Sequence, residues 1–175
     1  PSLSLEAWGE LDEEKGITPL GLPRESDWIL WGPYNFDLTL MHNPFIYELS
    51  NQIGRYAPRT RFVEVFLNTG GGPLRSNDYF GVYALTEKIK RDDDRVSVSK
   101  LFPEHDRMPN LGGGYLLKID RADPGDSGFS QAGQRLRYVY PKEVVIERPE
   151  REAQERFIRD FFRDLGRAVN GSQFR

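Results

Sequence analysis

The chain has 175 residues and a net charge of −3, from 24 basic and 27 acidic side chains, and it contains no cysteine. Disulfides, zinc–thiolate sites and thiol nucleophiles are therefore excluded, and without a basic excess the chain is not expected to bind nucleic acid. The aromatic content of 13% favours a folded domain over disorder, and no apolar run approaches the ~18 residues of a membrane span.

The first half of the chain predicts a leader, a strand and a helix. Residues 1–22 are poorly periodic and read as a leader that supplies an edge strand at best. Residues 27–34 form a short aromatic strand closed by a turn. A helix is expected over 44–53, with Asn43 as its N-cap and Pro44 at its first position. The apolar residues with helical spacing are Leu38, Met41, Phe45, Leu49 and Ile53.

A β-hairpin and further strands follow this helix. Residues 61–68 and 79–89 are rich in β-branched and aromatic side chains and predict two antiparallel strands. The glycine-rich segment 69–78 between them reads as a loose hairpin loop, because it lacks the spacing of a phosphate-binding loop. Three more strands are expected over residues 112–120, 136–140 and 143–146.

A long amphipathic helix is expected over 149–170, with Pro149 at its first position and Gly171 at its end. Its apolar stripe consists of Ala153, Phe157, Phe161, Leu165 and Ala168. A stripe this apolar must dock on something, so the helix belongs to a packed domain. If its partner surface is missing, self-association through residues 157–162 is a reasonable expectation. The order of elements predicts the α+β class, with an antiparallel sheet and a packed helix, then extra strands and this C-terminal helix.

Two carboxylates stand out as candidate inward-facing groups. Glu87 follows an apolar strand and shares a face with Tyr83 and Leu85, while Glu48 is central in the first helix. Each is more often a surface charge when considered alone. The carboxylates at 120, 123 and 126 could bind a divalent ion, although a solvated turn is favoured.

The segments together resemble the CotH kinase family, the spore coat protein H-like proteins with an atypical protein-kinase-like fold. The matching motifs are LPxESDWILxGPY (22–34), NxxxYELxxxIG (43–54), APRTRFVEVFLN (57–68), FGVYxLxEKIK (80–90) and GGYLLKID (113–120). Five motifs in this order over residues 22–120 make the resemblance far more specific than any single glycine run.

The resemblance implies a kinase-like small lobe and hinge region over 23–147, after the leader 1–22, with 148–175 as the first helix of a second lobe. It implies ATP and Mg²⁺ for the full-length family. By analogy, the helix with Glu48 corresponds to the kinase helix that orients the catalytic lysine. Backbone groups near Glu87 would then form hydrogen bonds with adenine. Tyr83 or Tyr115 would stack on the base.

The chain also departs from the family pattern. Family members carry an Arg-Gly and Ser-rich segment and a Lys-containing strand upstream, and Asn-x-Asp and Trp-Asp-x-Asp motifs downstream. Neither set flanks the matched motifs in this chain, and His42 replaces the usual Arg. We therefore expect a central part of such a protein, with no catalytic or metal-binding residues of its own and weak or absent ATP binding.

The function implied is that of part of a CotH-like kinase that transfers ATP phosphate to Ser or Thr of a coat, envelope or surface protein. The resemblance places it in the spore coat, at the cell surface or in the secreted fraction. The alternative is a non-catalytic surface-adhesion or structural module with the same fold.

Overall fold

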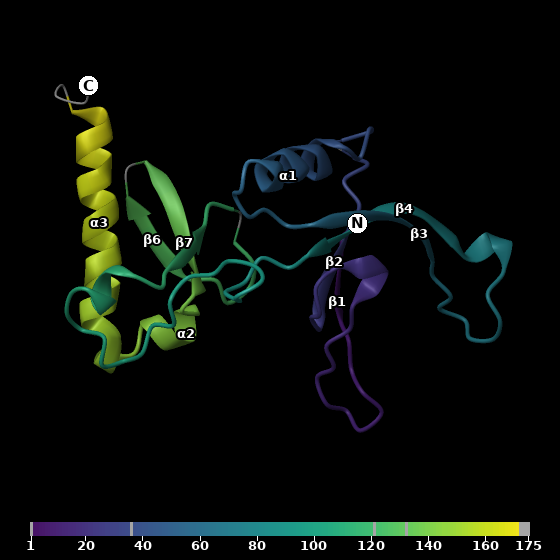
Figure 1. Ribbon diagram of the computed structural model, residues 1–175, viewed down its shortest axis with the longest axis horizontal. Helices are drawn as coiled ribbons and strands as arrows, with labels where there is room; N and C mark the ends of the chain where they lie inside the picture. Colours follow the sequence, from purple (N-terminus) through teal and green to yellow (C-terminus); the bar gives the residue numbers. More distant parts are fainter. Residues whose placement is uncertain (1, 36, 121, 132, 172–175) are drawn as a thin grey trace. The chain divides into compact units, whose positions relative to one another are not determined.

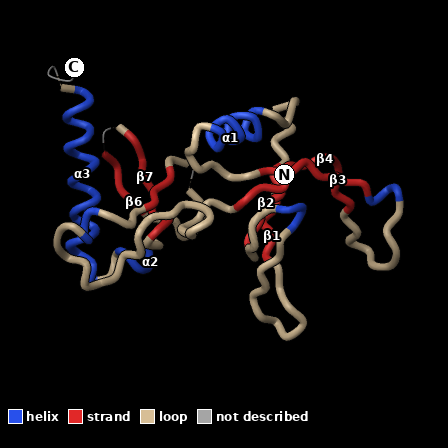
Figure 2. Tube along the Cα trace, viewed as in Figure 1, coloured by secondary structure: helices blue, strands red, loops and turns tan. Residues whose placement is uncertain are grey.

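The computed structural model describes residues 2–35, 37–120, 122–131 and 133–171. The chain divides into two units, Pro1–Ile89 and Lys90–Arg175, each built around its own sheet. Figure 1 labels most of the helices and strands and colours the chain along its sequence, and Figure 2 separates helix, strand and loop by colour. The sheets are antiparallel and the last helix is long, so the predicted α+β class is confirmed.

The first unit contains a four-stranded sheet in the order β1-β2-β4-β3. Its strands are β1 (Leu3–Glu6), β2 (Asp27–Trp31), β3 (Thr60–Phe66) and β4 (Tyr79–Glu87). The predicted hairpin is confirmed as β3 and β4, and the leader supplies the edge strand β1. Trp28 pairs with Glu87 and Leu30 with Leu85, which places these four side chains on one face. Leu22, Trp28 and Leu85 form the buried core of this unit.

Helix α1 (His42–Gln52) begins two residues earlier than expected, and the prediction of Asn43 as N-cap is wrong. A remote carboxylate does the capping: Asp37, which is buried, accepts the His42 amide at 3.1 Å and pairs with His42 Nδ1 at 2.9 Å. Desolvation raises the pKa of Asp37, but the hydrogen bonds from Thr39 and His42 outweigh it and the pKa is lowered. Pro44 is tolerated because amides in the first turn have no intrahelical acceptor.

The other end of α1 is fixed by a side-chain amide. Asn51 Nδ2 donates to the Ala57 carbonyl at 3.0 Å, and Asn51 Oδ1 accepts the Ala57 amide at 3.0 Å. The predicted apolar stripe of this helix is exposed at Leu38, Met41, Phe45, Leu49 and Ile53. These polar contacts at its two ends therefore hold α1 in the first unit.

The second unit contains a three-stranded sheet in the order β5-β7-β6. Its strands are β5 (Leu116–Lys118), β6 (Gly128–Gln131) and β7 (Gln134–Tyr140). The strand expected over 112–120 is shorter because residues 110–112 form a 3-10 turn and Gly114 adopts a φ of 84°. A Cβ at position 114 would lie 2.4 Å from the Ser99 carbonyl oxygen, so this entry into β5 requires glycine.

The expected strand over 143–146 is wrong, because these residues form the one-turn helix α2 (Glu143–Ile146). The Val145 and Ile146 amides both donate to the Lys142 carbonyl at 2.9 Å. A run of three apolar residues, Val144 to Ile146, is compatible with either structure, and its periodicity does not decide between them.

The predicted C-terminal helix is confirmed as α3 (Glu152–Asn170), preceded by a 3-10 turn over Pro149–Arg151. Its inner face joins the core of the second unit, whose buried members are Phe129, Leu136, Tyr138, Ile146 and Ile158. Within the described ranges, no helix combines the length and apolar character needed to cross a membrane.

Candidate functional site

Glu87 is the last residue of β4, and its carboxylate is fully buried in a cluster of donors. Arg59 Nη2 donates to Glu87 Oε1 at 2.7 Å, and Arg59 Nε donates to Oε2 at 3.0 Å. The Arg59 amide and the Tyr56 hydroxyl donate to the same Oε2 at 2.9 and 3.3 Å. A buried carboxylate costs little only when it is paired and hydrogen-bonded, and here a bidentate guanidinium meets that need.

These donors all come from residues 56–59, the segment that links α1 to β3. The Glu87 amide also donates to the Arg59 carbonyl at 3.3 Å, so side chain and backbone both bind the end of β4 to the start of β3. Glu87 therefore positions the chain at the end of this strand. The backbone that follows it, at Lys88 and Ile89, lies just beyond this fixed point.

Tyr83 lies on the same face of β4 as Glu87 and is buried. Its ring stacks on Phe80, with the centroids 5.8 Å apart and the planes inclined by 6°. Gly32, the residue that follows β2, lies against this ring, because a Cβ there would be 2.4 Å from Tyr83 Cε1. The absence of a side chain at Gly32 thus makes room for the tyrosine.

The structure brings Tyr83 and Glu87 together on one strand, but it places the other two candidates differently. Glu48 is exposed on α1, and its carboxylate accepts a hydrogen bond from Gln52 Nε2 at 2.9 Å. Tyr115 belongs to the second unit, where it precedes β5.

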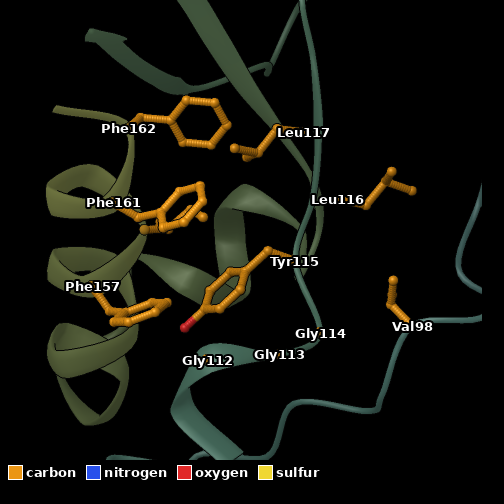
Figure 3. Close-up of a pocket in the computed structure, with 11 residues that line it drawn as sticks. Val98, Gly112, Gly113, Gly114, Tyr115, Leu116, Leu117, Phe157, Phe161 and Phe162 are labelled. Atoms are coloured by element: carbon orange, nitrogen blue, oxygen red, sulfur yellow. The ribbon is translucent and has the colours of Figure 1, made fainter. Parts of the chain in front are cut away.

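Tyr115 lines a pocket of about 470 Å³ (Figure 3). The pocket lies between α3 and residues 112–117, the segment that leads into β5. Phe157, Phe161 and Phe162 project from α3 toward Tyr115 and Leu117 (Figure 3). The remaining lining residues are Val98, Gly112, Gly113, Gly114, Leu116 and Ile158. All of these residues are uncharged, so the pocket suits a neutral apolar or aromatic group.

The phenol of Tyr115 is anchored at this pocket. Its hydroxyl donates to the Leu111 carbonyl at 3.0 Å and to the Gln154 carbonyl at 3.4 Å, and its ring stacks on Phe157 at 5.9 Å. Burial raises the pKa of Tyr115 to about 12, although the charge of Arg151 opposes part of this rise. The phenol is therefore neutral at physiological pH.

Gln154, which is fully buried on α3, fixes the loop over 101–105. Its Nε2 donates to the carbonyls of Phe102 at 2.6 Å and His105 at 3.1 Å. Its Oε1 accepts from Arg151 Nη1 at 2.8 Å, and the same nitrogen donates to the Leu101 carbonyl at 3.2 Å. This network anchors the start of α3 without a formal charge pair.

Two clusters of acidic side chains have the donor atoms of a metal site. Oxygens of Glu14, Glu25 and Asp27 all lie within 4.8 Å of one another, but Lys88 Nζ pairs with Asp27 at 3.0 Å and the Ser26 hydroxyl donates to Glu14 and Glu25. These contacts already neutralise part of the negative charge that a cation would require.

The carboxylates at 123 and 126 belong to a turn organised by a lysine. Lys118 Nζ lies 2.7 Å from Asp126 and 3.3 Å from Asp123, and Asp126 also accepts the Asp123 amide at 3.1 Å. The bond from Lys118 is the main cause of the lowered pKa of Asp126. The contacts are those of a turn closed by an internal cation.

Sequence reasoning missed four residues on which these sites depend: Tyr56, Arg59, Gln154 and the helix cap Asp37. Arg59 had a usable signal, because an acid at the end of a buried strand requires a cation and Arg59 lies in the motif over 57–68. Gln154 had none, since a glutamine on a helix is ordinarily exposed.

The two units define an α+β protein whose helix α1 precedes the β3–β4 hairpin and whose β4 ends at a clamped carboxylate. The family model described as CotH kinase protein matches residues 1–174, and the chain belongs to the CotH kinase family. It is a kinase-like protein at the level of that family. Searches of curated proteins and of solved structures gave no match.

Proposed function

We propose that the chain is part of a CotH-like atypical protein kinase that transfers the terminal phosphate of ATP to Ser or Thr of a coat or surface protein. The observation that carries this proposal is the family match over residues 1–174. The corresponding places of action are the spore coat, the cell surface or the secreted fraction.

For the nucleotide, we propose that adenine meets the backbone that follows Glu87, in the manner of a kinase hinge. The Arg59–Glu87 pair supports this assignment because it fixes where β4 ends. Glu87 then acts as a positioning residue, since its carboxylate already accepts from Tyr56 and Arg59. Tyr83 can offer a base little more than a ring edge, because it is 5% exposed.

A second candidate position for the base is the pocket beside Tyr115. Its uncharged aromatic lining favours a planar neutral ring, and its volume of about 470 Å³ is within the range of small-molecule sites. Glu48 is exposed on α1, and by the kinase analogy we propose it as the carboxylate of the helix that orients the catalytic lysine.

Magnesium would be supplied with ATP and would neutralise charge on the transferring phosphate. The acidic group at Glu14, Glu25 and Asp27 fits it poorly, because Lys88 and Ser26 already bind these carboxylates. No metal ligand is therefore assigned to the described residues of this chain.

The adenine position is tested by recording amide NMR spectra of the chain during titration with ATP and, separately, with adenosine. We expect dissociation constants weaker than micromolar, and we expect both ligands to shift the amide signals of residues 85–89. Shifts confined to residues 112–117 and 157–162 would favour the pocket beside Tyr115. Micromolar, Mg²⁺-dependent ATP binding by the chain alone would contradict the expectation of weak binding.

The sequence of the parent reading frame and the activity of its product distinguish a kinase from a non-catalytic module. A frame that continues into the Asn-x-Asp and Trp-Asp-x-Asp motifs, and whose product transfers labelled phosphate to Ser or Thr, supports the kinase. A product that contains both motifs and transfers none supports the surface-adhesion or structural module.

A further inference from the structure

We propose that the free edge of β3 binds an extended segment of another protein by strand addition, and that this segment carries a basic residue between apolar ones. The strand order β1-β2-β4-β3 places β3 at the edge of the first sheet. The strand has seven residues without proline or lysine, and the one irregularity of its pairing lies in β4, where Phe80 is the extra residue. Prolines, lysines and bulges are what usually protect an edge, so β3 is open to a further strand.

The backbone along this edge offers unpaired hydrogen-bonding groups. The Glu87 amide donates to the Arg59 carbonyl at 3.3 Å, and antiparallel bonds recur at every second residue, so the odd-numbered residues of β3 face β4. The amides and carbonyls of Phe62 and Glu64 therefore point away from the sheet. Within residues 2–35, 37–120, 122–131 and 133–171, no hydrogen bond reaches these four groups. An added strand would supply their partners.

The side chains beside this edge define the chemistry of the partner. Phe62, Glu64 and Phe66 alternate onto one face of β3, and all three are exposed. In an antiparallel pair, opposite charges and aromatic–β-branched neighbours that face each other across the strands are stabilising. The preferred segment therefore has Lys or Arg opposite Glu64 and a β-branched or aromatic residue two positions to either side.

A second copy of β3 does not meet this requirement. Because the outward-facing residues are even-numbered, antiparallel pairing of two β3 edges sets even-numbered residues opposite each other. Glu64 would then face an even-numbered residue of the second copy, and none of these is basic: Thr60, Phe62, Glu64 and Phe66. Arg61 is odd-numbered, and its Nη1 already donates to the Thr60 carbonyl at 2.9 Å. Charge complementarity therefore favours a different protein, and the proposal is independent of the kinase function.

Amide hydrogen exchange of the 175-residue chain, followed by NMR, tests the strand addition. The probe is the end-blocked peptide Gly-Thr-Val-Thr-Lys-Thr-Val-Thr-Gly, whose Lys falls opposite Glu64 and whose two Val fall opposite Phe62 and Phe66. At about 90% saturation the Phe62 and Glu64 amides should exchange about tenfold more slowly, because only the free protein exposes them. The Val63 amide, which faces β4, should not change.

The same peptide with N-methyl groups on its Lys and both Val should not bind, because it lacks the amide donors. Equal binding by the methylated peptide, or unchanged exchange at Phe62 and Glu64, overturns the proposal. Exchange at these two amides that slows with protein concentration in the absence of peptide would place a second copy at the edge and also overturn it.

A charge reversal tests the chemistry of the partner. The unmodified chain should bind the Lys peptide about three- to tenfold more tightly than a peptide with Glu in place of Lys. Glu64→Lys should reverse this preference. The matched control is Glu10→Lys, which makes the same charge change at another exposed glutamate of the first unit and should keep the original preference. A preference unaltered by Glu64→Lys, or reversed equally by Glu10→Lys, overturns the predicted pairing.

Discussion

The two units hold their functional residues in place by different means. In the first unit the core is small, with Leu22, Trp28 and Leu85, and a buried ion pair between Arg59 and Glu87 completes it. In the second unit a larger aromatic and aliphatic core joins α2, α3 and the sheet, and Tyr115 packs against it as a neutral phenol. A charge pair can therefore define the end of a strand where apolar packing is sparse.

The units can be monitored separately. The three tryptophans of the chain, Trp8, Trp28 and Trp31, all lie in the first unit, so their fluorescence reports its unfolding. The long helix α3 lies in the second unit and dominates the helical circular dichroism. Each substitution below is therefore expected to move one signal more than the other.

The largest effect is expected for Ile146→Ala in the second unit. Ile146 is completely buried in the core, and truncation should lower the free energy of unfolding by about 3 to 4 kcal/mol through lost burial and a cavity. Urea unfolding followed by circular dichroism measures this loss. Val144→Ala is the control on the same short helix: Val144 is 64% exposed, and a change within about 0.5 kcal/mol is expected.

This pair of variants also tests whether residues 143–146 form a helix, as in the structure, or the strand expected from the sequence. In a strand, residues 144 and 146 would point to the same face and truncation would cost similar amounts. Equal losses for the two variants would therefore contradict the α2 assignment.

Next in size is Glu87→Gln in the first unit. The substitution removes the carboxylate charge that pairs with Arg59 at 2.7 Å, and because Arg59 is 34% exposed the cost should be about 3 kcal/mol, at the lower end for a broken buried pair. Tryptophan fluorescence during urea unfolding measures it. The control is Glu64→Gln, since Glu64 is exposed on the neighbouring strand β3.

The pair itself is isolated by a double variant. Glu87→Gln with Arg59→Met removes both charges, so it should be less destabilising than the sum of the single substitutions. Additive losses would show that the two side chains stabilise the unit independently of each other.

A smaller effect is expected for Gly32→Ala. The new methyl group would lie 2.4 Å from the Tyr83 ring, and displacing the ring should cost about 1 to 2 kcal/mol of the first unit's stability. Tryptophan fluorescence again provides the measurement. Gly70→Ala is the control, because the nearest atom to a Cβ there is 3.9 Å away; an equal loss at both positions would argue against the contact with Tyr83.

Much of the fold was predictable because periodicity is a local property. The hairpin β3–β4 and helix α3 each carry a long pattern, and both were located to within a few residues. Helix α2 was missed because its three apolar residues are too few to show a period. The start of α1 was missed because its capping carboxylate, Asp37, lies outside the helix.

The candidate site was less predictable, since it depends on contacts between distant residues. The sequence singled out Glu87, but its partners lie 28 and 31 positions away, at Arg59 and Tyr56. Local patterns carry no information about such a pairing. Gln154 shows the same limit, because its acceptors lie about 50 positions earlier in the loop over 101–105.

The smallest effect concerns alkaline pH and is expected to be larger in the second unit, which has two tyrosines with a raised pKa, than in the first, where burial also raises the pKa of Tyr47. Burial raises the pKa of Tyr138, like that of Tyr115, to about 12, with partial opposition from Arg159. In the unfolded chain a phenol ionises near its ordinary value of 10.0, so deprotonation favours unfolding. This contribution to stability is complete below pH 10 and is lost as the pH rises from there toward 12.

Thermal unfolding at a series of alkaline pH values, followed by the circular dichroism of α3, measures this loss. Tyr138→Phe should reduce the dependence on pH because phenylalanine has no proton to lose, and Tyr79→Phe, at an exposed tyrosine of the first unit, should leave it unchanged. If the tryptophan signal of the first unit fell over the same pH range by the same amount, the buried phenols of the second unit would not be the cause.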